Sequence, residues 1–245
     1  MPAKNSRKLY AADSFYHLYN RGVERRIIFM DAQDYAVFTS YLKTYLLPKD
    51  IKQLHSIIAN PEYKWPKKDQ ALKLLRLNNF TDTLRLVAYC LMPNHFHLLL
   101  KQTEDTTIDR FMNSICTRFT MYFNRKYKRV GTLFEGVYKA VLVETDEQLL
   151  YLSKYIHRNP LDLILQGEAL QNMQNLRDYK YSSYRVYLES TASTNQEVYN
   201  FKWLHPEFIL PSFALTGVNS YQYFVENGPN DEHTEQLIDR LKIDG

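Results

Sequence analysis

The sequence predicts an α+β fold in which helices pack on a four-stranded antiparallel sheet. Two observations predict it: the order of strand-like and helix-like segments, and the turn chemistry that separates them. Segments with strand (β) or helix (α) patterns follow one another as β-α-β-β-α-β-α, at residues 14–21, 31–47, 84–91, 95–101, 107–129, 133–143 and from 145 onward. The first six segments match the ferredoxin-like split βαβ unit.

The predicted strands are short apolar or aromatic runs bounded by turn residues. SFYHLYNR at 14–21 ends at Gly22, and the run from Leu84 is interrupted by Met92-Pro93-Asn94. Proline and asparagine are typical of turns, so we expect a second strand to begin directly after them. Residues 133–143 form the fourth predicted strand.

The predicted helices have apolar residues at helical spacing. Residues 31–47 and 107–129 both place large apolar side chains at i, i+3 and i+4. A third helix should start at Thr145-Asp146-Glu147-Gln148, which has the form of a capping box. We expect Pro160 to end this helix, because the residue before a proline disfavours the α region.

The length of 245 residues suits one large domain with appendages. We expect a main domain at 1–190, with a polar, irregular insertion near 48–82 that holds at most a short helix near 69–77, and a C-terminal extension at 191–245. No apolar N-terminal region and no run of 18 apolar residues is present, which argues against export and membrane spanning. Cys90 and Cys116 lie in apolar patterns, so we expect buried thiols, no disulfide and a cytoplasmic location.

Two histidines bracket one phenylalanine at the start of the predicted strand 95–101. Alternate side chains of a strand point to the same face, so His95 and His97 should lie together while Phe96 points away. Such a pair is half of a metal site. Two structural histidines would give the same pattern, but the position beside a turn at a sheet end favours a functional site.

A second candidate site lies on the predicted helix that precedes Pro160. Tyr151, Tyr155 and Asn159 are spaced at i, i+4 and i+8, so they share one helix face. A tyrosine-rich helix that only packs its rings would show the same spacing, and the chain has 20 tyrosines.

Positive charge is concentrated in two parts of the chain. The window 118–139 contains six basic residues and one acid, Glu135, whereas the whole chain has a net charge of +4. The same window is rich in aromatic residues, and this combination is typical of nucleic-acid binding. Solvated helix faces are the alternative explanation. The candidate DNA-binding residues are Arg21, Arg25, Arg26, Arg118, Arg125, Lys126, Lys128, Arg129 and Lys139.

Five motifs together resemble one family, the REP-associated tyrosine transposases within the single-tyrosine HUH endonuclease superfamily. The motifs are YHLYNRG at 16–22, LMPNHFHLLL at 91–100, YFNRKYKRVGTLFEGVYKA at 122–140, YIHRNP at 155–160 and DYKYSSYRVYL at 178–188. The chain departs from the family pattern at Val137, at Lys180-Tyr181 and in the long insertion near 48–82.

The resemblance implies an enzyme that cleaves and rejoins single-stranded or hairpin DNA. It implies a ferredoxin-like fold of the HUH transposase type, a tyrosine nucleophile at Tyr155, and a divalent metal bound by His95 and His97 with Asn159 as third ligand. Mixed histidine and carboxamide ligation suits Mg²⁺ or Mn²⁺. The product would be a covalent 5′-phosphotyrosine with a free 3′-hydroxyl, from a monomer or homodimer.

Two other functions remain open from the sequence. One is a regulatory protein that binds hairpin DNA without cutting it. The other is a metal hydrolase of small phosphoesters, in which Tyr155 is structural. Tyr151 and Tyr138 also remain candidates for the nucleophile.

Overall fold

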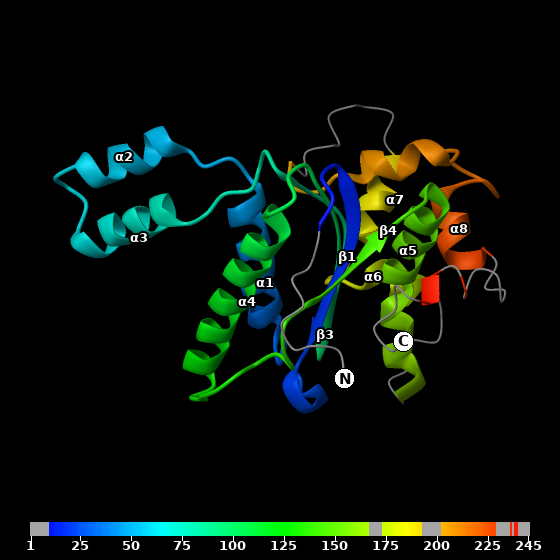
Figure 1. Cartoon of the computed structure of the whole chain (residues 1–245), viewed down its shortest axis with the longest axis horizontal. Helices are drawn as coiled ribbons and strands as arrows, with labels where there is room; N and C mark the ends of the chain where they lie inside the picture. Colours follow the sequence, from blue (N-terminus) through cyan, green and yellow to red (C-terminus); the bar gives the residue numbers. More distant parts are fainter. Residues whose placement is uncertain (1–9, 167–172, 193–201, 229–235, 237, 240–245) are drawn as a thin grey trace.

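The computed structural model describes residues 10–166, 173–192, 202–228, 236 and 238–239. These residues form a four-stranded antiparallel sheet with helices on both faces (Figure 1). The strands are β1 (Ser14–Arg21), β2 (Leu84–Met92), β3 (His95–Gln102) and β4 (Lys139–Val143). The α-helices are α1 (Ala32–Leu46), α2 (Ile51–Ala59), α3 (Trp65–Arg76), α4 (Thr107–Lys126), α5 (Asp146–Arg158), α6 (Met173–Asp178), α7 (Tyr184–Ala192) and α8 (Tyr221–Asn227). Short 3₁₀ helices are η1 (Val23–Arg25), η2 (Asn159–Gln166), η4 (Pro206–Phe208) and η5 (Leu210–Ser212).

The strands lie in the order β2-β3-β1-β4, so β1 and β3 form the centre of the sheet. All three neighbouring pairs are antiparallel. This order arises because the β1-α1-β2 crossover passes over β3, and the β3-α4-β4 crossover passes over β1. The predicted α+β fold with a ferredoxin-like four-stranded antiparallel sheet is confirmed.

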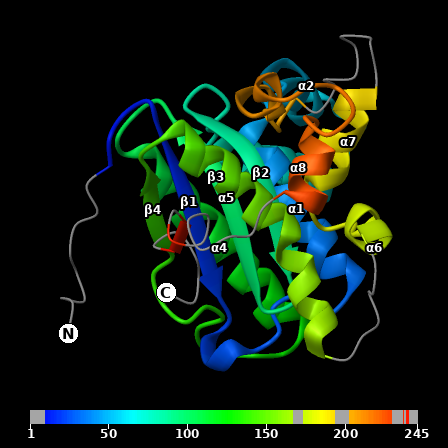
Figure 2. The same ribbon diagram turned by 90° about the vertical axis from the view of Figure 1, so that its right-hand side faces the viewer.

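The two faces of the sheet have different partners because side chains alternate along each strand. Phe96 points to the face that α1 and α4 cover, where its ring lies 5.2 Å from that of Phe38. The ring of Phe38 in turn meets Phe119 of α4 at 5.1 Å. His97 points to the opposite face, where α5 crosses the strands (Figure 2).

A buried carboxylate joins α1 to α4. Asp34 is fully buried and accepts hydrogen bonds from Lys126 Nζ at 2.8 Å, Tyr122 OH at 2.9 Å and Tyr127 OH at 2.8 Å. The backbone N–H of Met30 donates a fourth bond at 2.8 Å. Burial alone raises the pKa of Asp34, but the hydrogen bonds led by Lys126 outweigh it and hold the pKa below its ordinary value.

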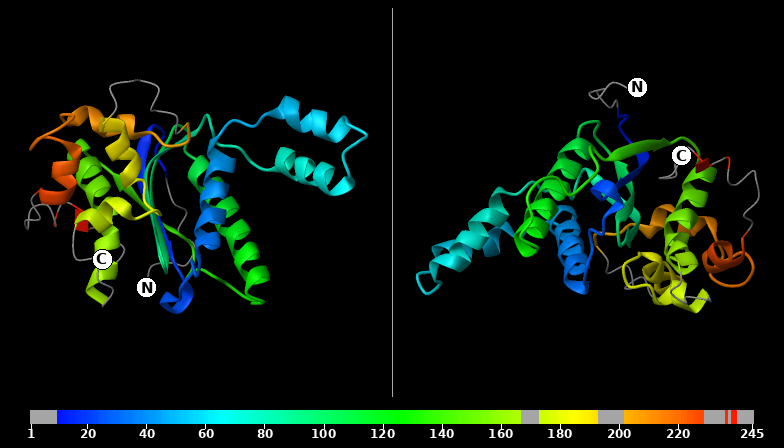
Figure 3. Two further views of the ribbon diagram at one scale, coloured as in Figure 1. Left: turned by 180° about the vertical axis from the view of Figure 1, so that it is seen from behind. Right: turned by 90° about the horizontal axis from the view of Figure 1, so that it is seen from below.

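The segment 48–82 is more regular than predicted: the short helix expected near 69–77 lies within α3, whereas α2 was expected to be irregular chain. It forms two helices, α2 and α3, which project from the rest of the molecule as an arm (Figures 1 and 3). Asp50 caps α2 by accepting a bond from the backbone N–H of Gln53 at 2.8 Å, and Pro66 lies in the first turn of α3. Proline does not destabilise a helix in its first turn, because a backbone N–H at that position would have no partner within the helix. The prolines therefore mark helix boundaries.

The α-helix that carries Tyr155 ends at Arg158, close to Pro160 as predicted, but Asn159 does not take the expected conformation. Pro160 does not move Asn159 out of the α region: Asn159 has φ −49° and ψ −37°, and the chain continues as η2. Asn159 therefore keeps its place on the helix face, one turn after Tyr155. The fourth strand is shorter than predicted, since β4 begins only at Lys139. The residues before it make isolated backbone hydrogen bonds to the end of β1, such as that from Glu135 N–H to Arg21 O at 2.9 Å.

Residues 202–228 of the predicted C-terminal extension pack against the sheet and α5. Trp203 and Leu204 are buried, and the backbone N–H of His205 donates to Leu86 O of β2 at 2.8 Å. Both cysteines are free, with Cys90 buried and Cys116 half-buried, as predicted. Among the described residues, no helix combines the length and the apolar character needed to cross a membrane.

Removing the Asp34 carboxylate should strongly destabilise the fold. Asp34→Ala leaves the phenols of Tyr122 and Tyr127 without this buried acceptor, while Lys126 keeps its pair with Asp31, so the free energy of unfolding should fall by about 2 kcal/mol. Urea unfolding followed by circular dichroism measures it. Asp69→Asn, which breaks only the surface pair with Lys73 at 2.6 Å, should change stability by less than about 0.5 kcal/mol. Equal effects of the two variants would contradict the assigned role.

Candidate active site

The β2–β3 hairpin presents the two histidines at one end of the sheet. Its tip at Pro93 and Asn94 is fastened to the chain that follows β1: the backbone N–H groups of Gly22 and Ile28 both donate bonds of 2.8 Å, to Asn94 O and Pro93 O. His95 and His97 then share one face of β3, with ring centroids 4.8 Å apart and planes at 88°. The predicted common face of the two histidines is confirmed.

A third histidine, which the sequence did not indicate, supports this pair. His17 of β1 is fully buried, and its Nε2 forms a hydrogen bond of 2.9 Å with Nδ1 of His97. The two rings stack at 5.0 Å. Residues of β1 and β3 pair as Tyr19 with His97 and Arg21 with His95, which brings His17 diagonally beside His97. The alternation in SFYHLYNR places His17 on the same face as Tyr19, but only the register reveals which face that is.

Helix α5 carries Tyr155 and Asn159 to the same histidines. The Tyr155 ring lies edge-on to His97 at 5.5 Å and to His17 at 6.2 Å. One turn later, Asn159 is 3% exposed, and its Oδ1 lies 3.2 Å from Nε2 of His95. The i, i+4 spacing therefore delivers a phenol and a carboxamide to neighbouring imidazoles.

The other two candidate tyrosines lie elsewhere. Tyr151 packs its ring on Phe224 of α8 at 5.2 Å. Tyr138 donates to Asp109, lies 2.6 Å from the hydroxyl of Tyr10, and has a strongly raised pKa, first because it is buried and then because of Asp109. Of these three tyrosines, only Tyr155 meets the histidines.

His95 and Asn159 bring a ring nitrogen and a carboxamide oxygen together. Nδ1 of His95 lies 2.6 Å from the side-chain oxygen of Asn94, and its Nε2 lies 3.2 Å from Oδ1 of Asn159. Imidazole nitrogen and carboxamide oxygen are both ligand types for Mn²⁺ and Mg²⁺.

His97 adds a buried nitrogen with no partner in the described part of the chain. Its Nδ1 is engaged by His17, whereas Nε2 makes no hydrogen bond. Burial, followed by the nearby His95 and His17, holds the pKa of His97 well below its ordinary value, so the ring is neutral and able to act as a ligand. No group of three His, Cys, Asp or Glu side chains that could hold a metal occurs among the described residues, and Asn159 adds a carboxamide oxygen beside His95.

The back of α5 is fixed by a second buried polar cluster. His157 forms hydrogen bonds with Tyr221 OH at 2.7 Å and Ser183 Oγ at 2.8 Å, and Tyr221 donates to Ser153 at 3.0 Å. Burial lowers the pKa of His157 to about 3, so this ring is neutral. Arg158 and Lys154 of α5 donate to backbone carbonyls of Val225 and Gly228 at the end of α8.

The predicted basic residues do not form one continuous surface. Arg21 pairs with Glu135, and both Arg25 and Lys139 lie near enough to help lower the pKa of Glu135. Arg21 is opposite His95 in the sheet, and Lys139 is opposite Tyr19, so this group borders the histidine site.

Other members of the predicted set have different surroundings. Lys126 is bound to Asp31 and Asp34, so its charge is already neutralised. Arg26 pairs with Glu24, and Arg129 donates to Asn124 Oδ1 at 3.1 Å. Arg118 lies on α4, on the other side of the sheet from His97, whereas Arg125 and Lys128 are exposed.

Comparison with known proteins places this site within a transposase-like stretch of the chain. The family described as "Transposase IS200 like" matches residues 49–159, which include the histidine pair, Tyr155 and Asn159. A solved REP-associated tyrosine transposase bound to a REP hairpin is 14% identical, with 74% of this chain and 82% of that chain covered and a TM-score of 0.41. A Deinococcus radiodurans R1 protein, described as a candidate transposase, is 18% identical, with 63% and 96% covered and a TM-score of 0.34. No curated protein matches the chain.

The fold and the site thus define an α+β protein whose residues 49–159 are similar to transposases. Residues 49–159 resemble the IS200-like transposases. This match confirms, for that part of the chain, the resemblance expected from the motifs.

The hydrogen bond between His17 and His97 should contribute measurably to stability. His17→Ala leaves the buried Nδ1 of His97 without a partner, so the free energy of unfolding should fall by about 2 kcal/mol. His17→Gln, whose carboxamide can still donate, should recover part of this loss. Urea unfolding of both variants is compared with that of His55→Ala, which removes an exposed histidine of α2. Equal stability of His17→Ala and His55→Ala would contradict the support that we assign to His17.

Proposed function

We propose that this protein cleaves and rejoins single-stranded or hairpin DNA, with Tyr155 as the nucleophile and a divalent metal held by His95, His97 and Asn159. One observation carries the proposal. Tyr155 stands 5.5 Å from the His97 ring while Asn159, one helical turn later, meets His95. The match of residues 49–159 to the IS200-like transposases supports the same reading.

The covalent step exchanges one phosphate ester for another. The Tyr155 oxygen forms a bond to phosphorus, the bond from phosphorus to the 3′-oxygen breaks, and the phenol proton is lost while the 3′-oxygen gains one. The products are a 5′-phosphotyrosine and a free 3′-hydroxyl. Because the new ester replaces the old one, the reverse attack by a 3′-hydroxyl can join strands without another energy source.

The residues around Tyr155 would orient this attack. Helix α5 is held from behind by His157 and Tyr221, so the phenol is presented from a rigid element. A phenol in water has a pKa of about 10 and is a poor nucleophile at neutral pH. A bound Mg²⁺ or Mn²⁺ would neutralise charge on the scissile phosphate and fix its position for in-line attack.

Within one copy of the chain, Tyr155 and Asn159 lie beside the histidines. This arrangement supports attack by Tyr155 on a strand bound to the same copy. The basic group around Glu135 borders this site and would contact the phosphates of the bound strand. Two free cysteines suit the cytoplasm, which is the proposed location.

Tyr155→Phe should abolish the covalent product while leaving the fold and the metal site intact. The phenylalanine ring keeps the packing against His97 but has no oxygen to attack phosphorus. The protein is incubated with hairpin DNA that carries a single-stranded tail and with Mn²⁺, and adducts are separated on a denaturing gel. Wild type should form an adduct, and Tyr155→Phe none, a loss of at least about 1,000-fold in rate.

Two measurements keep this result interpretable. Calorimetric titration with Mn²⁺ should show binding by Tyr155→Phe and weaker binding by His97→Ala, since only the second variant removes a ligand. An adduct that persists in Tyr155→Phe and maps to Tyr151 or Tyr138 would refute the assigned nucleophile. Wild-type protein that binds hairpin DNA yet never forms an adduct would favour a non-cutting DNA-binding protein.

The basic group beside the site should contribute to DNA affinity. Replacing Arg25 and Lys139 by glutamine should weaken binding of single-stranded DNA about tenfold and reduce the slope of log affinity against log salt by about 1.4, because about 0.7 is expected per phosphate contact. Fluorescence anisotropy at several salt concentrations measures both. The paired control Lys52→Gln with Lys64→Gln removes two exposed charges on the arm. Identical slopes for the two double variants would place the DNA path elsewhere.

A further inference from the structure

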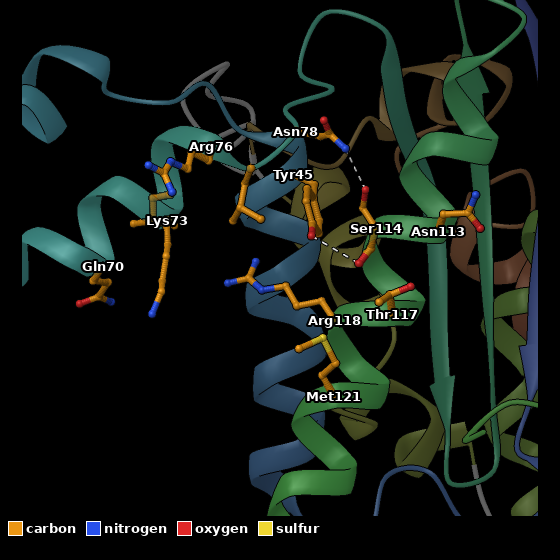
Figure 4. A pocket seen from close by; sticks show the side chains of 12 residues that line it. Tyr45, Gln70, Lys73, Arg76, Asn78, Asn113, Ser114, Thr117, Arg118 and Met121 are labelled. Atoms are coloured by element: carbon orange, nitrogen blue, oxygen red, sulfur yellow. Dashed lines mark hydrogen bonds between the residues drawn. The ribbon is translucent and has the colours of Figure 1, made fainter. Parts of the chain in front are cut away.

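A cavity of about 730 Å³ lies between the arm and the main body, on the side of the sheet opposite the histidines. It is bounded by α3 on one side and by α4 and the end of α1 on the other, and we refer to it as the arm cavity (Figure 4). Its volume falls in the range of sites for small ligands, about 300–1,000 Å³.

Hydrogen bonds at the base of the arm fix where it leaves the main body. Lys49 Nζ donates to Leu75 O at 3.0 Å and so joins the two ends of the arm. The side-chain amide of Asn79 donates to Leu47 O at 2.7 Å, and the backbone N–H of Phe80 donates to Tyr45 O at 2.8 Å. The side-chain amide of Asn78 donates to Ser114 Oγ of α4 at 3.0 Å, so the end of the arm contacts α4 directly.

The cavity is positively charged. Arg76 of α3 and Arg118 of α4 line it from opposite sides, and none of its lining residues is acidic (Figure 4). Lys73 of α3 also lines it and pairs with Asp69 at 2.6 Å. The wider arm segment 49–77 contains seven basic residues and three acids. An anionic occupant is therefore favoured over a neutral or cationic one.

Arg118 is the residue that most directly indicates an absent ligand. Its guanidinium stacks on the Tyr41 ring at 3.9 Å and lies 5.8 Å from the Tyr45 ring. Its hydrogen bond with Tyr45 opposes the burial that raises the pKa of that phenol. Its Nη1 is buried and makes no hydrogen bond to any described residue. A buried guanidinium N–H without an acceptor is costly, and a phosphate oxygen would satisfy it.

The rest of the cavity is apolar or carries neutral donors and acceptors. Leu74, Leu77 and Met121 supply apolar surface, and Asn78 and Asn113 supply amide groups. The Met121 side chain is 68% exposed, which is unusual for a large apolar residue beside three cations. Apolar walls with a basic rim suit a planar base attached to a phosphate.

We propose that the arm cavity binds an unpaired nucleotide of the DNA, with its phosphate on Arg118 and Arg76 and its base against Leu74 and Met121. The proposal rests on the proposed function for the identity of the ligand as DNA. A cavity of about 730 Å³ has the size of a small-ligand site, so it admits a single nucleotide outside the stack and not a duplex. The arm cavity then gives the protein a second contact with the strand, remote from Tyr155.

The test compares two DNA probes and two matched sets of variants. The probes are a fluorescein-labelled hairpin with a ten-nucleotide single-stranded tail and the same hairpin without a tail, both in EDTA so that no strand is cut. The cavity variant is Lys73→Gln, Arg76→Gln and Arg118→Gln. The control variant, Lys52→Gln, Lys64→Gln and Lys67→Gln, removes the same charge from exposed residues of the arm outside the cavity.

The cavity variant should bind the tailed hairpin about tenfold more weakly than wild type and the tailless hairpin within about twofold. The control variant should show a change below about threefold on both probes. Thr117→Trp, which adds a large ring at the cavity wall without changing charge, should also weaken binding of the tailed hairpin. Circular dichroism of each variant confirms that it is folded.

Equal losses for the cavity and control variants would overturn the proposal, because the arm would then act only through its general charge. Unchanged affinity of Thr117→Trp for the tailed hairpin would overturn it as well, because no base would enter the cavity. Failure of the proposed function is a separate result: wild-type protein would form no adduct with Mn²⁺, whatever the arm cavity binds.

Discussion

The pairing of β1 with β3 is the constraint on which the candidate site depends. It brings Tyr19 opposite His97 and Arg21 opposite His95, and it places His17 within hydrogen-bond distance of His97. The turn after β1 is equally restricted. A side chain at Gly22 would place its Cβ 2.2 Å from Arg26 O, so only glycine allows the chain to fold back against the Asn94 turn. The histidines are therefore held by the most central pair of strands in the sheet.

Helix α5 completes the site because it is anchored on both sides. Toward the sheet, Tyr155 and Asn159 meet the histidines; away from it, His157 contacts Tyr221 and Ser183. The C-terminal segment thereby supports the helix that carries the proposed nucleophile. A helix that is held by hydrogen bonds on one face and presents functional groups on the other keeps those groups in place for in-line chemistry.

The distribution of charge follows the two faces of the sheet rather than the sequence. Basic residues that are neighbours in the window 118–139 separate in space: Lys139 borders the histidines, Lys126 is neutralised by Asp31 and Asp34, and Arg118 faces the arm cavity. A contiguous run of positive charge in the sequence thus corresponds to a structural ion pair and to two distinct surfaces. The aromatic residues of the window also divide, since Phe119 and Phe123 are buried in the core.

The sequence by itself determined the features that depend on local geometry. The strand period placed His95 and His97 on one face, the helical period placed Asn159 beside Tyr155, and the order of elements predicted the ferredoxin-like sheet. The helices of the arm are also local features: the sequence indicates part of α3 near 69–77, but the polar residues of 48–64 hide α2. Only the tertiary structure decided that His17 supports His97, which is 80 residues away. It also decided that Tyr151 packs on Phe224 instead of reaching the site, and that Arg118 lines a separate cavity. These outcomes depend on strand register and on packing between distant segments, which local periodicity does not encode.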